Sequence, residues 1–407
     1  MHILDTLKER GFIAQVTFEE DLYKAMEQEP ITFYLGVDPT ADSLHVGHFI
    51  PILMSAHLQR AGHRPIILCG GGTAMVGDPS GKTDLRKMMT RETIAQNVAA
   101  IQKQLSRFID FSEGKAIMAN NADWLLPLNY VDFLRDIGAL FSVNHMLAAD
   151  CYKKRLEVGL TFLEFNYMLM QSYDFLELFK RHGCRLQIGG DDQWSNILSG
   201  ADLIRRKERE PAFALTCKLI MTADGKKMGK TEKGALWLDP ARTTPYEFYQ
   251  YWRNVQDADV ERFLALLTFL PMDEVRRLGA QKDSAINEAK RILAFEVTKL
   301  IHGEDEANKA QDAAQALFGG SGTMENVPTY TVTLASLAED NHLTTLLAAC
   351  GLCSSRSEAR KMVQSGAVLM GDIKVTDIQQ QIEAAQIGAD GLLLRKGKKS
   401  YCRLVLG

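Results

Sequence analysis

ITFYLGVDPTADSLHVGH, residues 31–48, is the stretch that decides the fold of this chain. Its apolar first part, residues 31–37, predicts a buried strand, and Pro39 with the Asp/Ser cluster behind it ends that strand. A pattern of helical period then begins near Val46 and continues to Ala61. The stretch therefore predicts a strand, a loop and a helix in succession.

Two histidines, His45 and His48, lie three residues apart at the start of that helix and project from one face. A helix N-terminus carries unpaired N–H groups and partial positive charge, so it attracts phosphate. Two imidazoles there can donate hydrogen bonds to one phosphoryl group, and Gly47 lets a flat ring lie against the backbone. By itself such a pair is more often two unrelated histidines or half a metal site, although no Glu-flanked pair of the metalloprotease type is present.

The next part of the chain repeats the order of strand and loop. Residues 64–69 predict a second buried strand, and the glycine-rich stretch GGGTAMVGDPSGKT follows at 70–83. Only three residues separate Gly77 from the Gly-Lys-Thr triplet where a P-loop has four, so a P-loop NTPase is rejected. The loop still carries Lys82 and Arg86, which are four residues apart and can clamp one anionic group.

A polar face lies within an apolar helical segment further along. Tyr167, Gln171 and Asp174 are spaced i, i+4, i+7 and therefore share one face of a helix. If this face is buried, its polar groups must be paired with each other or must bind a ligand. The sequence alone leaves a satisfied hydrogen-bond network and a binding site equally open.

Two further loops suggest nucleotide chemistry. After a short strand at 184–188, the turn GGDDQ places an acidic residue, Asp192, where open parallel sheets hold a ribose. Later, the loop GKKMGKTEKG at 225–234 carries Lys227 and Lys230, which can close over a triphosphate and follow its charge into the transition state. Alone, neither loop identifies a function.

Composition bounds the class of protein. A chain of 407 residues predicts two or three domains, and 46% hydrophobic with 24% charged residues is typical of a soluble globular protein. No run approaches a membrane span, and the N-terminus has a helical pattern rather than that of a signal peptide. Seven scattered cysteines predict free thiols in a reducing compartment, so we expect a cytoplasmic protein without membrane contact.

Taken together, these motifs resemble class I aminoacyl-tRNA synthetases, and in detail the bacterial tyrosyl-tRNA synthetase family. Residues 34–48 resemble the first class signature and residues 225–234 the second, and the resemblance covers nearly the whole chain. It implies an α/β, Rossmann-like doubly wound parallel sheet, then an all-helical domain and a small α+β RNA-binding domain. The implied activity is that of a tyrosine–tRNA ligase, which activates L-tyrosine with ATP and transfers it to the 3′-terminal ribose of tRNA(Tyr). The resemblance implies no tightly bound cofactor and no protein metal site, with Mg²⁺ accompanying ATP.

The resemblance also assigns roles to residues of this chain. It implies that the charge of the transition state is stabilised by His45, His48, Lys82, Arg86, Lys227 and Lys230, with Thr231 in the second signature. Tyrosine is bound by Tyr34, Asp78, Tyr167, Gln171, Asp174, Gln187 and Gln193. Asp78, Tyr167 and Gln171 are expected at the ammonium group, and Tyr34 and Asp174 at the phenolic hydroxyl. ATP is bound by Gly36, Asp38, Gly47, Gly190, Asp192 and Lys230.

The sequence departs from the family pattern at two places. Gly229 and Thr231 replace the two more usual serines of the second signature, so the hydroxyl normally at position 229 is absent. Asp191 stands where the family often has Ser, which leaves the role of that position open.

Domain boundaries follow from motifs and composition. We expect a catalytic domain at 1–220 with a helical first 30 residues, a mobile lysine loop at 221–235, and a helical domain at 236–320, which the resemblance places on the anticodon side. A linker at 321–340, which the run GGSG at 319–322 introduces, leads to a basic domain at 341–407, which holds nine Lys and Arg against five Asp and Glu. This domain resembles a small RNA-binding module shared with a ribosomal protein. We expect its Arg356, Arg360 and Lys361 to face a phosphate backbone from one helix.

Apolar residues are too numerous at 129–165 for a purely solvated surface. The sequence leaves core and subunit contact open for Phe133, Leu134, Ile137, Leu140, Phe141 and Met146, and the resemblance favours a homodimer contact. Two other functions remain as alternatives: a tryptophan-specific relative, and an RNA-binding protein with a catalytically silent body.

Overall fold

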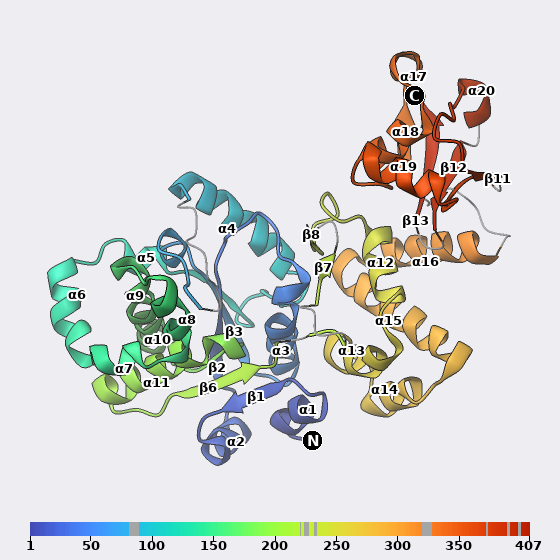
Figure 1. Cartoon of the computed structure of the whole chain (residues 1–407). Coiled ribbons are helices and arrows are strands. Elements are labelled where there is room, and N and C mark those ends of the chain that lie inside the picture. Colours follow the sequence, from blue (N-terminus) through green and yellow to red (C-terminus); the bar gives the residue numbers. More distant parts are fainter. Residues whose placement is uncertain are drawn as a thin grey trace. The chain divides into compact units, whose positions relative to one another are not determined.

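The computed structural model describes residues 1–80, 89–219, 221–223, 228–231, 234–319, 328–371, 373–388, 391–397 and 400–407. Within these ranges the chain forms two compact units (Figure 1). The first comprises residues 1–244 and 251–302, and the second comprises residues 245–250 and 303–407. No helix in the described ranges is long and apolar enough to cross a membrane.

The first unit is built on a six-stranded sheet of order β1-β6-β5-β2-β3-β4. Its strands are β1 (Ile13–Val16), β2 (Thr32–Val37), β3 (Arg64–Cys69), β4 (Ile117–Asn120), β5 (Cys184–Gly190) and β6 (Phe213–Cys217). The five strands from β6 to β4 are parallel, which confirms the predicted doubly wound sheet. The prediction that the first 30 residues are helical throughout was wrong at β1, which pairs antiparallel with β6. A four-residue edge strand depends on its partner more than on its own pattern.

The strand order reverses at β2, which lies between β3 and β5. In register with Tyr34 of β2 are Ile66 on one side and Gln187 on the other. Because the chain leaves β2 toward β3 and leaves β5 toward β6, in opposite directions, a crevice is expected at the carboxyl ends of β2 and β5. These two strands and the loops that follow them carry ten of the predicted site residues, from Tyr34 to His48 and from Gln187 to Gln193.

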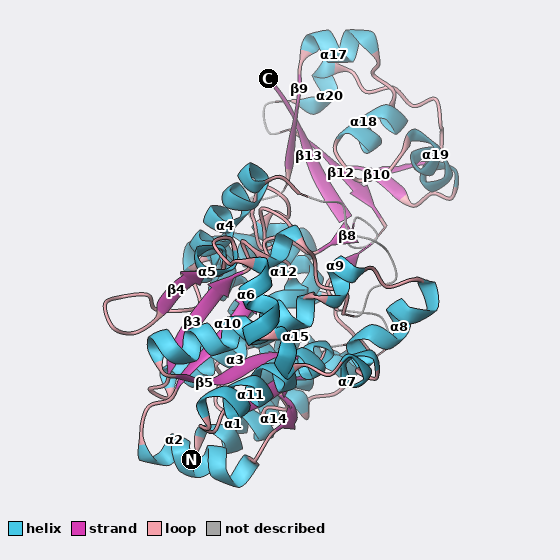
Figure 2. Ribbon diagram, turned by 90° about the vertical axis from the view of Figure 1, so that its left-hand side faces the viewer, coloured by secondary structure: helices cyan, strands magenta, loops and turns pink. Residues whose placement is uncertain are grey.

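Helices cover both faces of this sheet (Figure 2). The apolar helix α3 (Phe49–Arg60) packs against β2, β3, β5 and β6, while α10 (Tyr167–His182) and α11 (Trp194–Glu208) pack against each other and on β5. The other helices of this part are α1 (Ile3–Glu9), α2 (Glu19–Gln28), α4 (Arg91–Leu105), α5 (Ala122–Leu125), α6 (Tyr130–Asp136), α7 (Val143–Leu147), α8 (Asp150–Val158) and α9 (Phe162–Phe165).

The stretch from 245 to 319 is helical, as predicted. Its helices are α12 (Pro245–Arg253), α13 (Val260–Leu267), α14 (Met272–Gly279), α15 (Ile286–His302) and α16 (Glu304–Gly319). A short hairpin precedes them, made of β7 (Lys230–Thr231) and β8 (Gly234–Ala235).

The second unit contains a five-stranded sheet of order β11-β10-β12-β13-β9. Its elements are β9 (Thr329–Val332), β10 (Val368–Met370), β11 (Ile373–Val375), β12 (Leu392–Lys396), β13 (Ser400–Leu406), α17 (Leu334–Glu339), α18 (Leu343–Ala349), α19 (Arg356–Gln364) and α20 (Ala384–Ile387). The stretch 321–340, for which composition suggested a linker, contains β9 and α17. β9 pairs in parallel with β13, and Val332 and Leu337 join the core of the unit.

Candidate active site

A group of buried polar side chains lies on β2, β5 and α10, next to the crevice between β2 and β5. Tyr34 of β2 and Asp174 of α10 are 1% and 2% exposed, and the ring of Tyr34 packs edge-on against Phe175 at 5.3 Å. The hydroxyl of Tyr34 and the side-chain oxygens of Gln171 and Gln187 are buried without a hydrogen-bond partner. Because buried polar atoms are nearly always satisfied, these three atoms are candidates for binding a polar ligand.

Two residues that the sequence did not single out hold the carboxylate of Asp174. Nδ2 of Asn121 donates to it at 2.9 Å and Nε1 of Trp124 at 2.7 Å. Burial raises the pKa of Asp174 to about 7, although these two hydrogen bonds oppose the shift. Both donors follow β4, the neighbour of β3, and polar residues after a third parallel strand were the signal that could have revealed them.

A second network starts from Asp38, directly after β2. The hydroxyl of Tyr167 donates to Oδ2 of Asp38 at 3.0 Å, and the hydroxyl of Thr73 donates to Oδ1 at 3.0 Å. Nδ2 of Asn121 in turn donates to Oγ1 of Thr73. The network therefore connects Asp38, which is predicted to bind ATP, with Tyr167, which is predicted to bind the substrate tyrosine. It also reaches Asn121, which donates to Asp174.

Asp78 and Gln193, both predicted to contact tyrosine, also meet in the structure. Nε2 of Gln193 donates to Oδ2 of Asp78 at 2.7 Å, and the backbone N–H of Ser80 donates to Oδ1 at 2.8 Å. Asn196, one turn into α11, donates to Oε1 of Gln193 at 3.2 Å. The sequence gave no reason to select Ser80 or Asn196.

The histidine pair has a defined tautomer. Nδ1 of His45 accepts from the backbone N–H of Gly47 at 3.0 Å, and Nδ1 of His48 accepts from the backbone N–H of His45 at 3.3 Å. The two rings stack with centroids 4.0 Å apart. A neutral ring that accepts at Nδ1 carries its proton on Nε2, so both rings present an N–H donor. A Cβ at Gly47 would lie 2.6 Å from Cε1 of His45, which explains the glycine.

Two glycines shape the expected nucleotide side. Gly36 is the exposed position of the otherwise buried strand β2, where a flat group can lie against the backbone. A Cβ at Gly190 would lie 2.6 Å from Oδ1 of Asp192, the predicted ribose ligand, which begins the next turn. Asp191 has a structural role: its Oδ1 accepts from Gln15 at 2.8 Å and from Thr216 at 2.9 Å, tying β1 to β6.

The lysine loop approaches the histidines through Gly229. This residue has φ +78°, and a Cβ on it would lie 2.9 Å from Cβ of Val46. Its N–H donates to the hydroxyl of Tyr251 at 2.9 Å. Both the backbone conformation and the close approach account for glycine where the family usually has serine.

Several predicted residues cannot be placed. Lys82, Arg86 and Lys227 lie outside the described residues, and Lys230 and Thr231 are described only as backbone of β7.

In the second unit, the three predicted RNA contacts lie on α19. Arg356, Arg360 and Lys361 are all exposed, and Arg356 is ion-paired with Asp340 at 3.0 Å. Arg356 and Arg360 are one turn apart and share a face of the helix. Exposed cations on one helix can follow a phosphate backbone.

The comparisons with known proteins agree with this geometry. A family model described as tRNA synthetases class I (W and Y) matches residues 26–319. The sheet, the crevice and the histidine pair thus define a class I aminoacyl-tRNA synthetase, and the chain belongs to that class. A second model, described as the tyrosine–tRNA ligase SYY-like C-terminal domain, matches residues 321–404.

Full-length relatives narrow the family further. The chain is 60% identical over 406 residues to a tyrosine–tRNA ligase of Caldanaerobacter subterraneus subsp. tengcongensis, and 59% identical over 407 residues to one of Clostridium botulinum. Each alignment covers 100% of both chains. The chain is therefore a member of the tyrosyl-tRNA synthetase family, which confirms the resemblance seen in the sequence.

Solved structures show the same fold. A C-terminally truncated mitochondrial tyrosyl-tRNA synthetase of Aspergillus nidulans matches with a TM-score of 0.70 and 31% identity, covering 78% of this chain and 94% of that one. A tryptophanyl-tRNA synthetase of Encephalitozoon cuniculi matches with a TM-score of 0.57 at 13% identity, covering 75% and 86%, and shares the fold.

Proposed function

We propose that the chain is a tyrosine–tRNA ligase. A carboxylate oxygen of L-tyrosine attacks the α-phosphorus of ATP, the bond to the β-phosphate oxygen breaks, and tyrosyl-adenylate and pyrophosphate form. A ribose hydroxyl at the 3′ end of tRNA(Tyr) then attacks the tyrosyl carbonyl carbon, and AMP leaves. The observation that carries this proposal is the buried pocket with three unpartnered polar atoms, on Tyr34, Gln171 and Gln187.

The pocket suits the phenol of tyrosine. The Asp174 carboxylate, oriented by Asn121 and Trp124, accepts the phenolic hydrogen, and the hydroxyl of Tyr34 donates to the phenolic oxygen. A site built to bond a hydroxyl rejects an analogue that lacks it, an effect for which tyrosyl-tRNA synthetases are themselves the standard example. The ammonium end of the amino acid is bound by Asp78, Tyr167 and Gln171. Gln187 and Gln193 make further contacts with the substrate.

The nucleotide occupies the crevice at the ends of β2 and β5. Gly36, Gly47 and Gly190 leave room for its flat parts, and Asp38 and Asp192 hold polar groups of its ribose side. The Nε2–H donors of His45 and His48 bind the phosphate oxygens as the α-phosphorus becomes five-coordinate. Lys82, Arg86, Lys227, Lys230 and Thr231 act on the departing pyrophosphate. No protein nucleophile is needed, so catalysis is positioning plus charge stabilisation.

Magnesium enters as part of the ATP substrate, and we assign it no ligand among the protein side chains. We place the reaction in the cytoplasm, a reducing compartment that suits the seven free cysteines.

We further propose a homodimer through the outer face of α5–α9. The sequence had left six residues there open between core and contact, and five of them belong to the core: Ile137 and Met146 are buried, and Phe133, Leu140 and Phe141 pack against buried clusters. The sixth residue, Leu134, is exposed. The exposed apolar side chains of this region are Leu126, Tyr130, Val131, Leu134, Val143, Leu147, Leu156, Val158, Phe162 and Leu163. A patch of this kind marks a protein interface. Sedimentation should give twice the chain mass, and a monomer would refute the dimer.

We propose that different parts of the chain activate tyrosine and bind tRNA. The catalytic domain at 1–220 and the lysine loop at 221–235 activate tyrosine. The helical domain at 236–320 lies on the anticodon side, and the domain at 341–407, reached after 321–340, holds the RNA backbone with Arg356, Arg360 and Lys361. Replacing these three cations by Gln should weaken tRNA binding and its salt dependence while leaving tyrosine activation unchanged.

The first experiment is ATP–pyrophosphate exchange without tRNA, with tyrosine, tryptophan and phenylalanine run separately. Exchange with tyrosine only is the expected result. Exchange with tryptophan would overturn the amino-acid pocket but keep the nucleotide site. No exchange with any amino acid would favour an RNA-binding protein with a silent catalytic body.

A further inference from the structure

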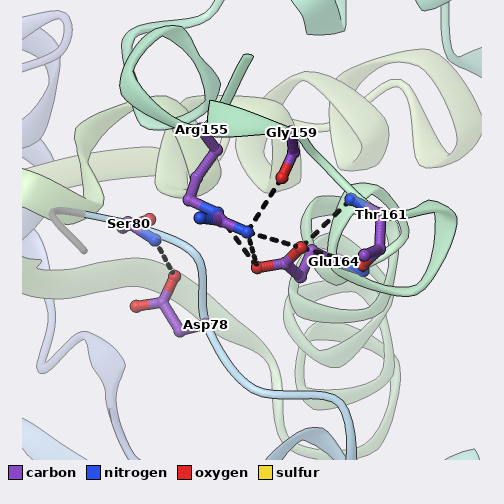
Figure 3. Close-up of polar contacts among 6 residues, drawn as sticks. All are labelled: Asp78, Ser80, Arg155, Gly159, Thr161 and Glu164. Atoms are coloured by element: carbon purple, nitrogen blue, oxygen red, sulfur yellow. Dashed lines mark hydrogen bonds and ion pairs between the residues drawn. The ribbon is translucent and has the colours of Figure 1, made fainter. Parts of the chain in front are cut away.

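A buried ion pair lies outside the residues assigned so far. Nε and Nη2 of Arg155 on α8 donate to the two carboxylate oxygens of Glu164 on α9 at 3.1 and 3.2 Å (Figure 3). The two side chains are 4% and 10% exposed. Glu164 also accepts from the backbone N–H and hydroxyl of Thr161, and Nη2 of Arg155 donates to the carbonyl of Gly159. Burying two charges costs desolvation energy that an apolar pair would avoid, so stability alone does not account for them.

The helix that carries Arg155 also holds the beginning of α10. One turn before Arg155, the hydroxyl of Tyr152 donates to the carbonyl of Phe165 at 2.8 Å and accepts from the backbone N–H of Met168 at 3.4 Å. Tyr152 is fully buried. The Tyr152 and Glu164 contacts therefore fix α8 against the first turn of α10, where Tyr167 begins the polar face of the tyrosine site.

The same face of α8 lies beside Asp78. Burial together with the Asp78 charge raises the pKa of the Cys151 thiol to about 12, and burial, the Cys151 charge and, to a smaller extent, the Asp78 charge raise the pKa of Tyr152. Cys151 and Arg155 are four residues apart and so share that face. In Figure 3 the Asp78–Ser80 segment passes on the side of the Arg155 guanidinium opposite to Thr161. The Asp78–Ser80 segment and the Arg155–Glu164 pair therefore belong to the same region of the molecule, as the effect of the Asp78 charge on Cys151 and Tyr152 also indicates.

We infer that Arg155, neutralised by Glu164, is a positioning residue for the subsite that binds the α-ammonium group of tyrosine. The pair sets the separation between Asp78 and the first turns of α10, which carry Tyr167 and Gln171. Glu164 has a second effect, because its charge keeps the guanidinium from pairing with Asp78 in place of the substrate ammonium. The inference rests on the proposed tyrosine site.

The test is Glu164→Gln, assayed by pyrophosphate exchange with two competitive inhibitors. Tyramine keeps the ammonium group and the phenol, whereas 3-(4-hydroxyphenyl)propanoate lacks the ammonium group. We expect KM for tyrosine and Ki for tyramine to rise about tenfold, because small displacements of positioning groups have effects of this order. The Ki of the propanoate, the KM for ATP and kcat should stay near wild type.

Two further variants separate positioning from folding. Arg155→Gln/Glu164→Gln removes the competing guanidinium, so its KM for tyrosine should lie below that of Glu164→Gln, and Arg155→Lys should be intermediate. The matched control is Asp150→Asn, which breaks an exposed Asp150–Lys153 pair on α8, the helix that carries Arg155, and should change the Ki of neither inhibitor. An equal rise of Ki for both inhibitors in Glu164→Gln, or an unchanged KM for tyrosine, would overturn the inference. Failure of wild-type exchange with tyrosine would instead overturn the proposed function.

Discussion

Asp174→Asn is the substitution that tests the amino-acid pocket most directly. The carboxylate is 2% exposed and accepts from Asn121 at 2.9 Å and Trp124 at 2.7 Å. The amide nearly keeps its shape but loses the charge and one acceptor oxygen. A hydrogen bond to a charged group contributes about 1.5–3 kcal/mol, so kcat/KM for tyrosine should fall by about 10- to 150-fold.

The assay is pyrophosphate exchange with tyrosine and phenylalanine, compared as a ratio of kcat/KM. Phenylalanine makes no bond to Asp174, so its kcat/KM should change little and the preference for tyrosine should shrink by the same factor. Glu288→Gln on α15, which removes an exposed carboxylate paired with Arg291 outside the proposed site, is the control. A tyrosine to phenylalanine ratio that remains at the wild-type value would refute the role of Asp174.

Three other predictions concern the pKa of Asp174, the close approach of Gly229 to Val46, and the hydrogen bonds of Arg10. The pKa of Asp174 is raised to about 7 in the folded protein, against about 3.9 in an unfolded chain. Between these values the folded state keeps a proton that the unfolded chain has lost, so the free energy of unfolding should fall as pH rises through this window. Tyrosine affinity should rise with pH over the same window, because binding needs the ionised carboxylate of Asp174. Asp174→Asn should lack the part of each trend that Asp174 contributes in the wild type. Gly229→Ala should slow tyrosine activation because its Cβ would lie 2.9 Å from Cβ of Val46, while Gly234→Ala, also at positive φ but with open space, should not. Equal exchange rates in the two variants would contradict this. Arg10→Met should lower the free energy of unfolding by about 3 kcal/mol, because it leaves three carbonyl groups at and beyond the end of α13 without their donor; an unchanged urea midpoint would argue against it.

Elements with strong local signals were predictable from sequence. β2 and β3 are apolar runs, and each sits within one residue of its predicted bounds. The helical stretch from 245 to 319 and the hairpin of β10 and β11 also follow from local periodicity. β1 and β9 were not predicted, because each is a four-residue strand that exists through pairing with a segment far away in the chain.

Some residues of the candidate site were predictable from the sequence, and others were not. Motif order and spacing were sufficient to select the histidines, the polar face of α10 and the turn after β5. No spacing rule relates Asn121 and Trp124 to Asp174, or Gln193 to Asp78, because these partners come from different segments. They meet only when parallel strands bring their carboxyl ends to one edge.

By itself, the sequence determined the class of sheet, the family and the residue types that the chemistry requires, because these depend on short-range patterns and on glycine, proline and histidine at particular positions. Only the tertiary structure decided which polar atoms are left without partners. It also decided that Asp191 is structural and that Gly229 must lack a side chain. The physical reason is that burial and hydrogen-bond satisfaction are properties of the assembled sheet and its helices, and no single segment contains them.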